Sequence, residues 1–166
     1  MVAILLFVGA ILFASSMIFM HSGTAKVVWV TVGLVLTLGS IVLIILNYNQ
    51  YLGMKQVTTT TTVPLTSSSP KQKQVLLYRQ LGTKNERVYL YRTNPLDKTM
   101  KRTNPATGKV IVKHGARYNR VVIKKTYRVY RNEEYRLLFS AGVPNHQFIS
   151  QTWQFNLQSG WLVKPV

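Results

Sequence analysis

Two long apolar runs at the amino-terminal end constrain this chain more than any other feature. Residues 2–20 contain no charged side chain, and residues 27–46 contain none either. As helices rising about 1.5 Å per residue, these runs would be roughly 28 and 30 Å long, which matches the hydrocarbon thickness of a bilayer. Because lipid offers no hydrogen-bond partner to a free backbone amide, such runs cross a membrane as helices. The sequence therefore predicts a transmembrane helical hairpin over residues 1–48.

A cleavable secretory signal is the alternative interpretation of the first run. The apolar centre of such a signal usually covers about 7–15 residues and follows a cationic start. Here the run is longer and no cation precedes it, although Gly23, Thr24 and Ala25 are small enough for a peptidase to cut after them. We therefore expect the hairpin to be retained.

Small residues indicate how the two helices pack. Ala10 and Ala14 lie four residues apart in the first run, and Gly33 and Thr37 lie four apart in the second. Counted from the shared loop, Ala14 has the depth of Gly33, and Ala10 has the depth of Thr37. Small residues let helix backbones approach closely, and a threonine can hydrogen-bond to the neighbouring helix. The alternative, that small residues are simply common in membrane helices, stays open.

Charge is concentrated after the hairpin. The chain has a formal net charge of +17, and residues 55–166 hold 20 of the 21 Lys and Arg residues together with all four acids. Such a basic region favours anionic partners, namely lipid headgroups, nucleic acid or cell-wall polymers. The chain has no cysteine, which excludes disulfides, thiolate metal sites and thiol nucleophiles.

Alternating apolar and polar residues predict strands in the rest of the chain. The threonine-rich run at 56–63 is predicted to leave the membrane as a strand, with a flexible tether as the alternative. Turns are predicted at Asn94–Pro95, at Asn104–Pro105 and at 158–160. Further strands are predicted at 75–79, 87–92, 118–131, 134–140, 153–157 and 161–164, and a short helix is predicted at 144–150.

These elements together predict a membrane α+β protein. A helical hairpin is followed by a strand and loop at 49–70, and then by a basic antiparallel β domain at 71–166. Within that domain residues 118–140 should form a hairpin that turns at Asn132–Glu133. Trp153, Phe155 and Trp161 are predicted to lie in its core, because large aromatic side chains contribute most when they are buried.

The strand predicted at 118–131 is the most basic segment. Its five cations lie within twelve residues: Arg120, Lys124, Lys125, Arg128 and Arg131. Strand alternation puts Lys124, Arg128 and Tyr130 on one solvent-facing side, where cations and aromatic rings can hold phosphates and stack bases. Anionic lipid is favoured over nucleic acid because the hairpin holds the domain near a surface where each cation contributes about 1 kcal/mol. A face that only maintains solubility is a further alternative.

Catalytic and metal-binding patterns are not found in the sequence. His21, His114 and His146 are far apart and have no acid or second histidine at ligand spacing. Glu133 and Glu134 would point to opposite faces of a strand, so a turn explains them better than a catalytic pair. We therefore expect no enzymatic activity, no metal and no cofactor.

The side of the membrane is constrained by only a few charges. One cation, Lys26, lies in the loop between the runs, and one, Lys55, follows the second run, so the positive-inside rule favours neither orientation. The cations beyond Lys71 favour a cytoplasmic domain. The oligomeric state is not indicated by the sequence.

Several short stretches are similar to a known family. They are 53–60 (Gly-Met-Lys-Gln-Val-Thr-Thr-Thr), 76–78, 88–93, 127–138 and 161–163. In these stretches the chain resembles small two-span membrane proteins of lactic acid bacteria that carry a domain of unknown function. The resemblance covers nearly the whole chain and implies a bacterial plasma membrane, but no catalytic residue. With the charge pattern, it favours an accessory or scaffold protein that contacts lipid or a neighbouring membrane protein. A tethered binding module for nucleic acid or anionic wall polymer is the alternative.

Overall fold

The structure is a computed structural model that describes residues 1–69, 72–81, 86–96 and 99–166. Its residues divide into two compact units. Residues 1–56 and 128–147 form the first, which we call the helical unit, and residues 57–127 and 148–166 form the second, the sheet unit. The boundaries between the units fall within or beside strands β1, β6 and β7, whose bounds are given below.

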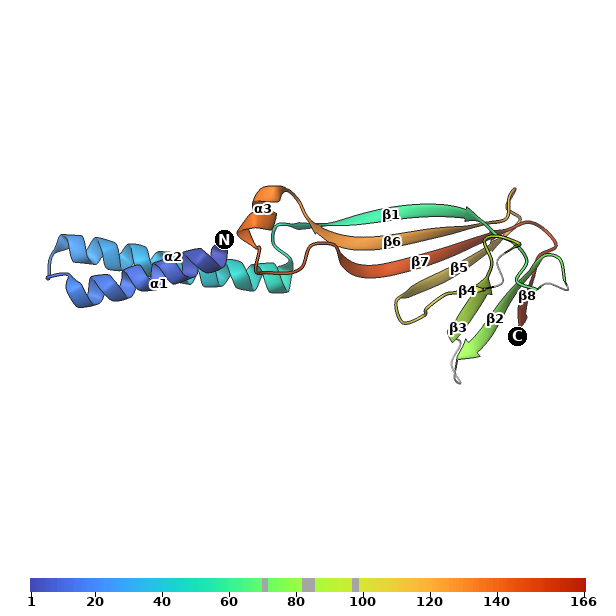
Figure 1. The fold of residues 1–166 in the computed structure, drawn as a ribbon, viewed down its shortest axis with the longest axis horizontal. Coiled ribbons are helices and arrows are strands. Elements are labelled where there is room, and N and C mark those ends of the chain that lie inside the picture. The colour runs from blue at the N-terminus through green and yellow to red at the C-terminus, as the bar shows by residue number, and fades with distance from the viewer. Residues whose placement is uncertain (70–71, 82–85, 97–98) are drawn as a thin grey trace. The chain divides into compact units, whose positions relative to one another are not determined.

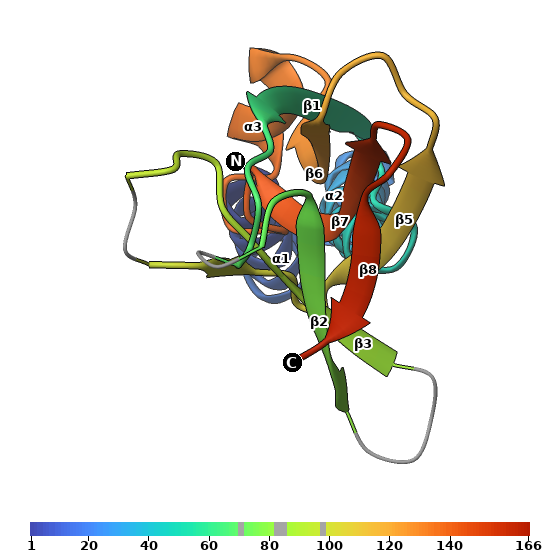
Figure 2. The same cartoon turned by 90° about the vertical axis from the view of Figure 1, so that its right-hand side faces the viewer.

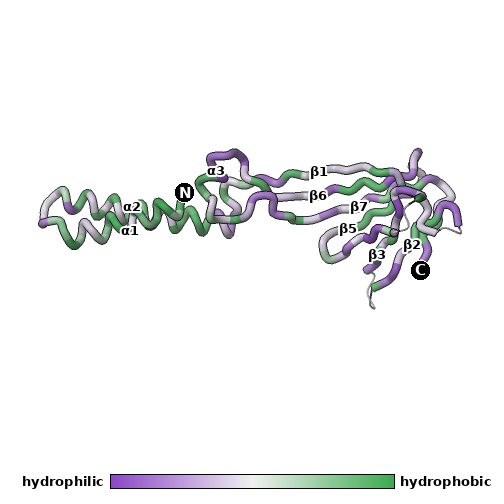
Figure 3. Tube along the Cα trace, in the orientation of Figure 1, coloured by the Kyte–Doolittle hydropathy of each residue, from purple (hydrophilic) through white to green (hydrophobic). Residues whose placement is uncertain are grey.

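Two long helices make up most of the helical unit (Figure 1). Helix α1 covers Val2–Phe19 and helix α2 covers Thr24–Gln50, and both are long and apolar enough to cross a membrane. Figure 3 shows the hydrophobic residues that run along both helices. The predicted runs at 2–20 and 27–46 thus lie almost entirely within these helices.

Within the described ranges the strands form two four-stranded sheets. In the first, the order is β1 (Met54–Pro64), β6 (Arg120–Tyr130), β7 (Gln147–Leu157) and β5 (Gly108–His114). In the second, it is β4 (Lys101–Arg102), β3 (Glu86–Tyr91), β2 (Val75–Leu81) and β8 (Leu162–Pro165). Strands were correctly predicted at 56–63, 75–79, 87–92 and 118–131.

The expectation of purely antiparallel sheets was wrong, because each sheet contains a parallel pair. Strand β5 runs parallel to β7, and β2 runs parallel to β8, with Val75 opposite Leu162 (Figure 2). The turn at 158–160 is present, but it leads β8 into the second sheet instead of back onto β7. A local alternating pattern identifies a strand without identifying its partner, so this error could not be seen from the sequence.

The segment that follows β6 is a helix, not the second strand of a hairpin. Helix α3 covers Glu133–Leu138, and the Asn132 side chain caps it by accepting a hydrogen bond from the Tyr135 N–H at 3.0 Å. Glu133 and Glu134 occupy its first turn, where acidic side chains stabilise a helix. The short helix predicted at 144–150 was also wrong, since β7 begins at Gln147.

The two sheets share one hydrophobic core inside the sheet unit. As predicted, Trp153, Phe155 and Trp161 are buried, and Leu76 and Tyr91 of the second sheet pack with them. The two Asn-Pro turns are also confirmed. The Asn94 side chain accepts from the Leu96 N–H and the Asn104 side chain from the Ala106 N–H, each at 3.0 Å.

Candidate functional site

The chain leaves helix α2 through a tight turn within the helical unit. Tyr51 ends the helix in the left-handed conformation (φ 57°), and its N–H bonds to the Leu46 carbonyl. Gly53 follows with φ 81°, and a β-carbon there would lie 2.7 Å from the Tyr135 ring. Only glycine fits both conditions. The turn therefore holds the α2 terminus against α3 and sets the position of the residues that begin β1.

A small apolar core lies beneath this turn. Its buried members are Val2, Met54, Tyr130, Phe139 and Val143. The Tyr130 and Tyr135 rings both stack with Phe139 at centroid distances of 6.4 Å. Strand alternation had assigned Tyr130 to a solvent-facing side, and this was wrong: at the end of β6 the side chain enters the core that α3 completes.

Two buried polar side chains, Asn47 of α2 and Tyr130 of β6, bond to the loop before β7. Asn47 is fully buried, donates to the Leu52 carbonyl at 2.9 Å and accepts from the Val143 N–H at 3.2 Å. The Tyr130 hydroxyl donates to the Val143 carbonyl at 2.7 Å. Burial raises the pKa of the Tyr130 phenol, while its hydrogen bond with Asn47 opposes that rise. These bonds satisfy groups that would be costly to bury unpaired.

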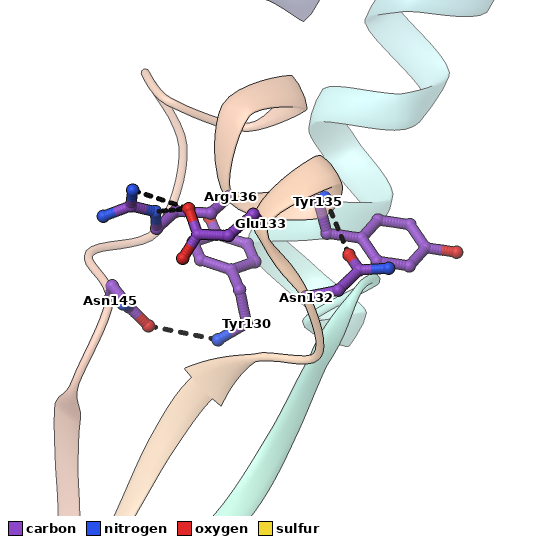
Figure 4. A network of polar contacts seen from close by, with 6 residues as sticks. All are labelled: Tyr130, Asn132, Glu133, Tyr135, Arg136 and Asn145. Atoms are coloured by element: carbon purple, nitrogen blue, oxygen red, sulfur yellow. Dashed lines mark hydrogen bonds and ion pairs between the residues drawn. The ribbon is translucent and has the colours of Figure 1, made fainter.

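Further polar contacts lie within α3 and between the end of β6 and the loop before β7, as Figure 4 shows. Arg136 forms an ion pair with Glu133 at 2.6 Å, and the Asn145 side chain accepts from the Tyr130 N–H at 3.1 Å. Glu133 is thereby occupied by a cation of its own helix. The pair stays exposed, so it orders the helix surface and contributes little to stability.

A half-open cavity of about 330 Å³ lies where α2 ends, and the described residues that line it all belong to the helical unit. Its wall includes the cations Lys55, Arg128 and Arg131 and the aromatic rings of Tyr51 and Tyr135. None of the described residues that line it is acidic. The cavity is therefore suited to an anion.

The three cations are held in different ways. The Arg128 guanidinium carbon lies 3.3 Å from the centre of the Tyr51 ring, and its Nη1 donates to the Gln147 side chain at 3.3 Å. Arg131 donates from Nε to the Met54 carbonyl at 3.3 Å. The Lys55 ammonium has no hydrogen-bond or ion-pair partner among the described residues. Two cations are thus positioned in advance, and the third is free to move toward a ligand.

The structure divides the five cations singled out from the sequence between the two units. Arg120, Lys124 and Lys125 are exposed side chains of the sheet unit, whereas Arg128 and Arg131 line the cavity of the helical unit. Lys55 also lines this cavity, whereas the sequence pattern indicates a role for it only in the orientation of the hairpin. Its place directly after an apolar helix was the available signal.

The helix contact differs in part from the one predicted. A β-carbon on Gly33 would lie 2.6 Å from the Phe13 backbone nitrogen, and one on Gly9 would lie 2.8 Å from Thr37. Gly33 and Thr37 are therefore at the contact. On α1, however, Gly9 lies against Thr37 and the Phe13 backbone lies against Gly33. Ala10 is half-buried and Ala14 is exposed.

A spacing of seven residues between buried positions explains why Gly9 lies at the contact between the helices. The buried residues are Val2, Gly9 and Ser16 in α1, and Gly33, Ser40 and Asn47 in α2. A repeat of seven keeps one face of each helix against its partner along the whole hairpin. The predicted spacing of four describes a single crossing point only.

Other features of the described residues are weaker candidates for a ligand site than the cavity beside α2. No group of three or more His, Cys, Asp or Glu side chains within them could hold a metal ion. A larger cavity of about 750 Å³ in the sheet unit is lined by Arg79, Arg102 and Glu86 among others. Because its wall carries both signs of charge, it is less selective for an anion than the cavity beside α2.

The comparisons with known proteins identify the family. Residues 22–164 match the model of DUF4811, described as a domain of unknown function, and the chain belongs to this family. The match includes α2, strands β1 to β7 and all but the last residue of β8, and it begins after α1. No curated protein and no solved structure matches the chain.

Proposed function

Because membership of this family assigns no activity, we propose a function from the residues themselves. The protein is an integral protein of a bacterial plasma membrane, anchored by α1 and α2. It acts as a non-enzymatic accessory or scaffold protein whose cations contact anionic lipid beside a membrane partner. The observation that carries the proposal is the apolar outer surface of the hairpin, which continues directly into a cationic cavity.

The outer surface of the hairpin supports membrane insertion. Large apolar side chains are exposed along both helices, among them Phe7, Ile18 and Val35. Exposed apolar surface of this extent is unfavourable in water and favourable in lipid. Two hydroxyl groups on these helices bond to their own backbone: Ser15 donates to the Ile11 carbonyl at 2.7 Å and Thr31 to the Val27 carbonyl at 2.8 Å.

The distribution of cations supports a cytoplasmic domain. Lys55, Arg128 and Arg131 gather where α2 ends, whereas Lys26 lies near the opposite end and bonds to the Met17 carbonyl at 3.0 Å. Three cations against one favour the side with the more anionic leaflet. The proposal of a scaffold in place of an enzyme is supported by the small number of acids, one of which is paired with Arg136.

Carbonate washing of membranes that contain the full chain tests the anchor. We expect the protein to remain in the membrane fraction. Release into the soluble fraction would overturn the proposal, because a peripheral protein is held only by its charges.

Two single cysteines test the topology, since the chain has none of its own. Ser22 lies in the exposed loop between the helices, and Ser159 lies in the exposed turn before β8. An impermeant thiol reagent on intact cells should label Ser22→Cys and spare Ser159→Cys. The reverse pattern would put the sheet unit outside the cell and favour wall polymer as its anionic partner. Labelling of both would exclude a hairpin that crosses the bilayer twice.

A further inference from the structure

We propose that the cavity at the end of α2 binds the phosphodiester headgroup of one anionic phospholipid. The inference rests on the proposed function, because it requires α2 to cross the bilayer. It goes further by assigning a ligand class and a binding site to named residues. Lys55 and Arg131 hold the phosphate, and Arg128, fixed on the Tyr51 ring, supplies a permanent positive charge beside it.

The depth of the cavity supports a lipid ligand. The uncharged run of α2 at residues 27–46 is about 30 Å long, which fills the hydrocarbon layer. The residues that line the cavity begin at Gln50, one helical turn beyond that run. Tyr48 and Tyr51 flank this point, and tyrosines favour the headgroup layer. The cavity therefore lies at the level of the lipid phosphates.

The chemistry of the wall supports a phosphate. Arg131 uses Nε for the Met54 carbonyl, so the two terminal nitrogens of its guanidinium group remain for a ligand. The Lys55 ammonium is unpartnered among the described residues and can donate up to three hydrogen bonds. Arginine matches two oxygens of a phosphate with two parallel hydrogen bonds. A site without a lining acid accepts this charge without a competing internal ion pair.

The size of the cavity also suits a phospholipid headgroup. A volume of about 330 Å³ is at the lower end of the range for small-molecule sites, enough for a headgroup but not for a whole lipid. The acyl chains would lie outside, along the apolar surface of α2. A free phosphate ion shares the headgroup chemistry but lacks this second contact, so the experiment must separate the two sources.

Native mass spectrometry of the full-length protein in detergent tests the site with three probes: phosphatidylglycerol, phosphatidylcholine and inorganic phosphate. We expect one phosphatidylglycerol per chain and at least about tenfold weaker binding of phosphatidylcholine, because the wall attracts a net negative charge. Inorganic phosphate at equal concentration should not displace the lipid. Displacement by it would overturn the lipid assignment and leave a free-anion site.

Charge-matched variants test the residues. Lys55→Gln with Arg131→Gln should weaken phosphatidylglycerol binding about thirtyfold, the factor expected for two cations at an anionic surface. Lys109→Gln with Lys113→Gln removes the same charge from exposed positions of β5 and should change binding less than about threefold. Lys55→Gln alone, which breaks no described bond, covers the case in which the double variant does not fold.

The outcomes separate the site from the proposed function. Equal weakening by the cavity variant and the β5 control would show unspecific attraction and overturn the site. So would an unchanged affinity in Lys55→Gln and in a folded double variant. If the wild-type chain survives carbonate washing but binds both lipids equally, the site fails and the membrane anchor stands. If carbonate releases the chain, the proposed membrane anchor is wrong, and the lipid site that depends on it is wrong as well.

Discussion

The helical hairpin and the sheet unit bury opposite kinds of side chain. Five of the six buried residues of α1 and α2 are small or polar: Gly9, Ser16, Gly33, Ser40 and Asn47. The sixth, Val2, belongs to the small apolar core with Phe139. In the sheet unit most of the buried residues are large and apolar, with Phe155 and Leu157 fully buried. The hairpin thus presents its apolar side chains outward, which is the arrangement expected when the surrounding solvent is lipid. The sheet unit buries its apolar side chains, which is the arrangement expected of a protein in water.

The largest expected difference in stability between the two regions is that between alanine variants of a buried and of an exposed tryptophan. Trp153 in β7 is 4% exposed, whereas Trp29 in α2 is 48% exposed. Trp153→Ala should lower the free energy of unfolding by about 3–5 kcal/mol, because it removes apolar contacts and leaves a cavity. Trp29→Ala should stay within about 0.5 kcal/mol. Denaturant titration in detergent, followed by circular dichroism, measures both, and equal losses would remove the contrast between the units.

Two glycines of α2 test the helix contact. Gly33→Ala should destabilise the hairpin by about 1–3 kcal/mol, because its new β-carbon would lie 2.6 Å from the Phe13 backbone nitrogen. Gly39→Ala is the matched control, since nothing lies within 4 Å of its added carbon. Unfolding of the hairpin in increasing dodecyl sulfate compares them. Identical midpoints would mean that the helices do not pack through Gly33.

Two asparagines near the end of α2 test the buried polar connection. Asn47→Leu should cost about 1–3 kcal/mol, because the Leu52 carbonyl and the Val143 N–H lose their partner. Asn49→Leu makes the same chemical change at an exposed position and should have little effect. Thermal unfolding in detergent distinguishes them. A control as unstable as the Asn47 variant would point to the added leucine and not to the lost bonds.

The smallest effect concerns one buried tyrosine in each unit. Burial raises the pKa of Tyr91 in the sheet unit, against a hydrogen bond from Trp153, and it also raises the pKa of Tyr130 in the helical unit. Both phenols stay neutral longer in the folded chain than in the unfolded one. Their contribution to stability is therefore complete below about pH 10 and is lost as the pH rises above it.

Denaturant titrations across that pH range measure this loss. In Tyr91→Phe the decline in unfolding free energy above about pH 10 should be shallower than in the wild-type chain, because one phenol no longer ionises on unfolding. Tyr130→Phe should show the same change. A decline as steep as in the wild-type chain would show that these tyrosines ionise equally in both states.

The candidate site could be predicted only in part from the sequence, because its cations come from segments that are far apart along the chain. Arg128 and Arg131 were singled out because they lie in a basic strand, but the cavity also needs Lys55, which is far away along the chain. Charge density within a window cannot detect a cation supplied by another segment. The helix contact shows the same limit, since Gly9 and Ala10 are neighbouring small residues and only the packing decides that Gly9 lies against Thr37.

The sequence by itself determined the two long apolar helices, most strands, both Asn-Pro turns and the aromatic core of the sheet unit. Each of these depends on local chemistry: length and hydropathy, alternation, or the turn preference of one dipeptide. Only the tertiary structure decided that β8 pairs with β2, that residues 133–138 form a helix and that Lys55 shares a cavity with Arg128 and Arg131. Strand partners and the fate of short segments depend on contacts between residues far apart in the chain, where tertiary packing outweighs local preference.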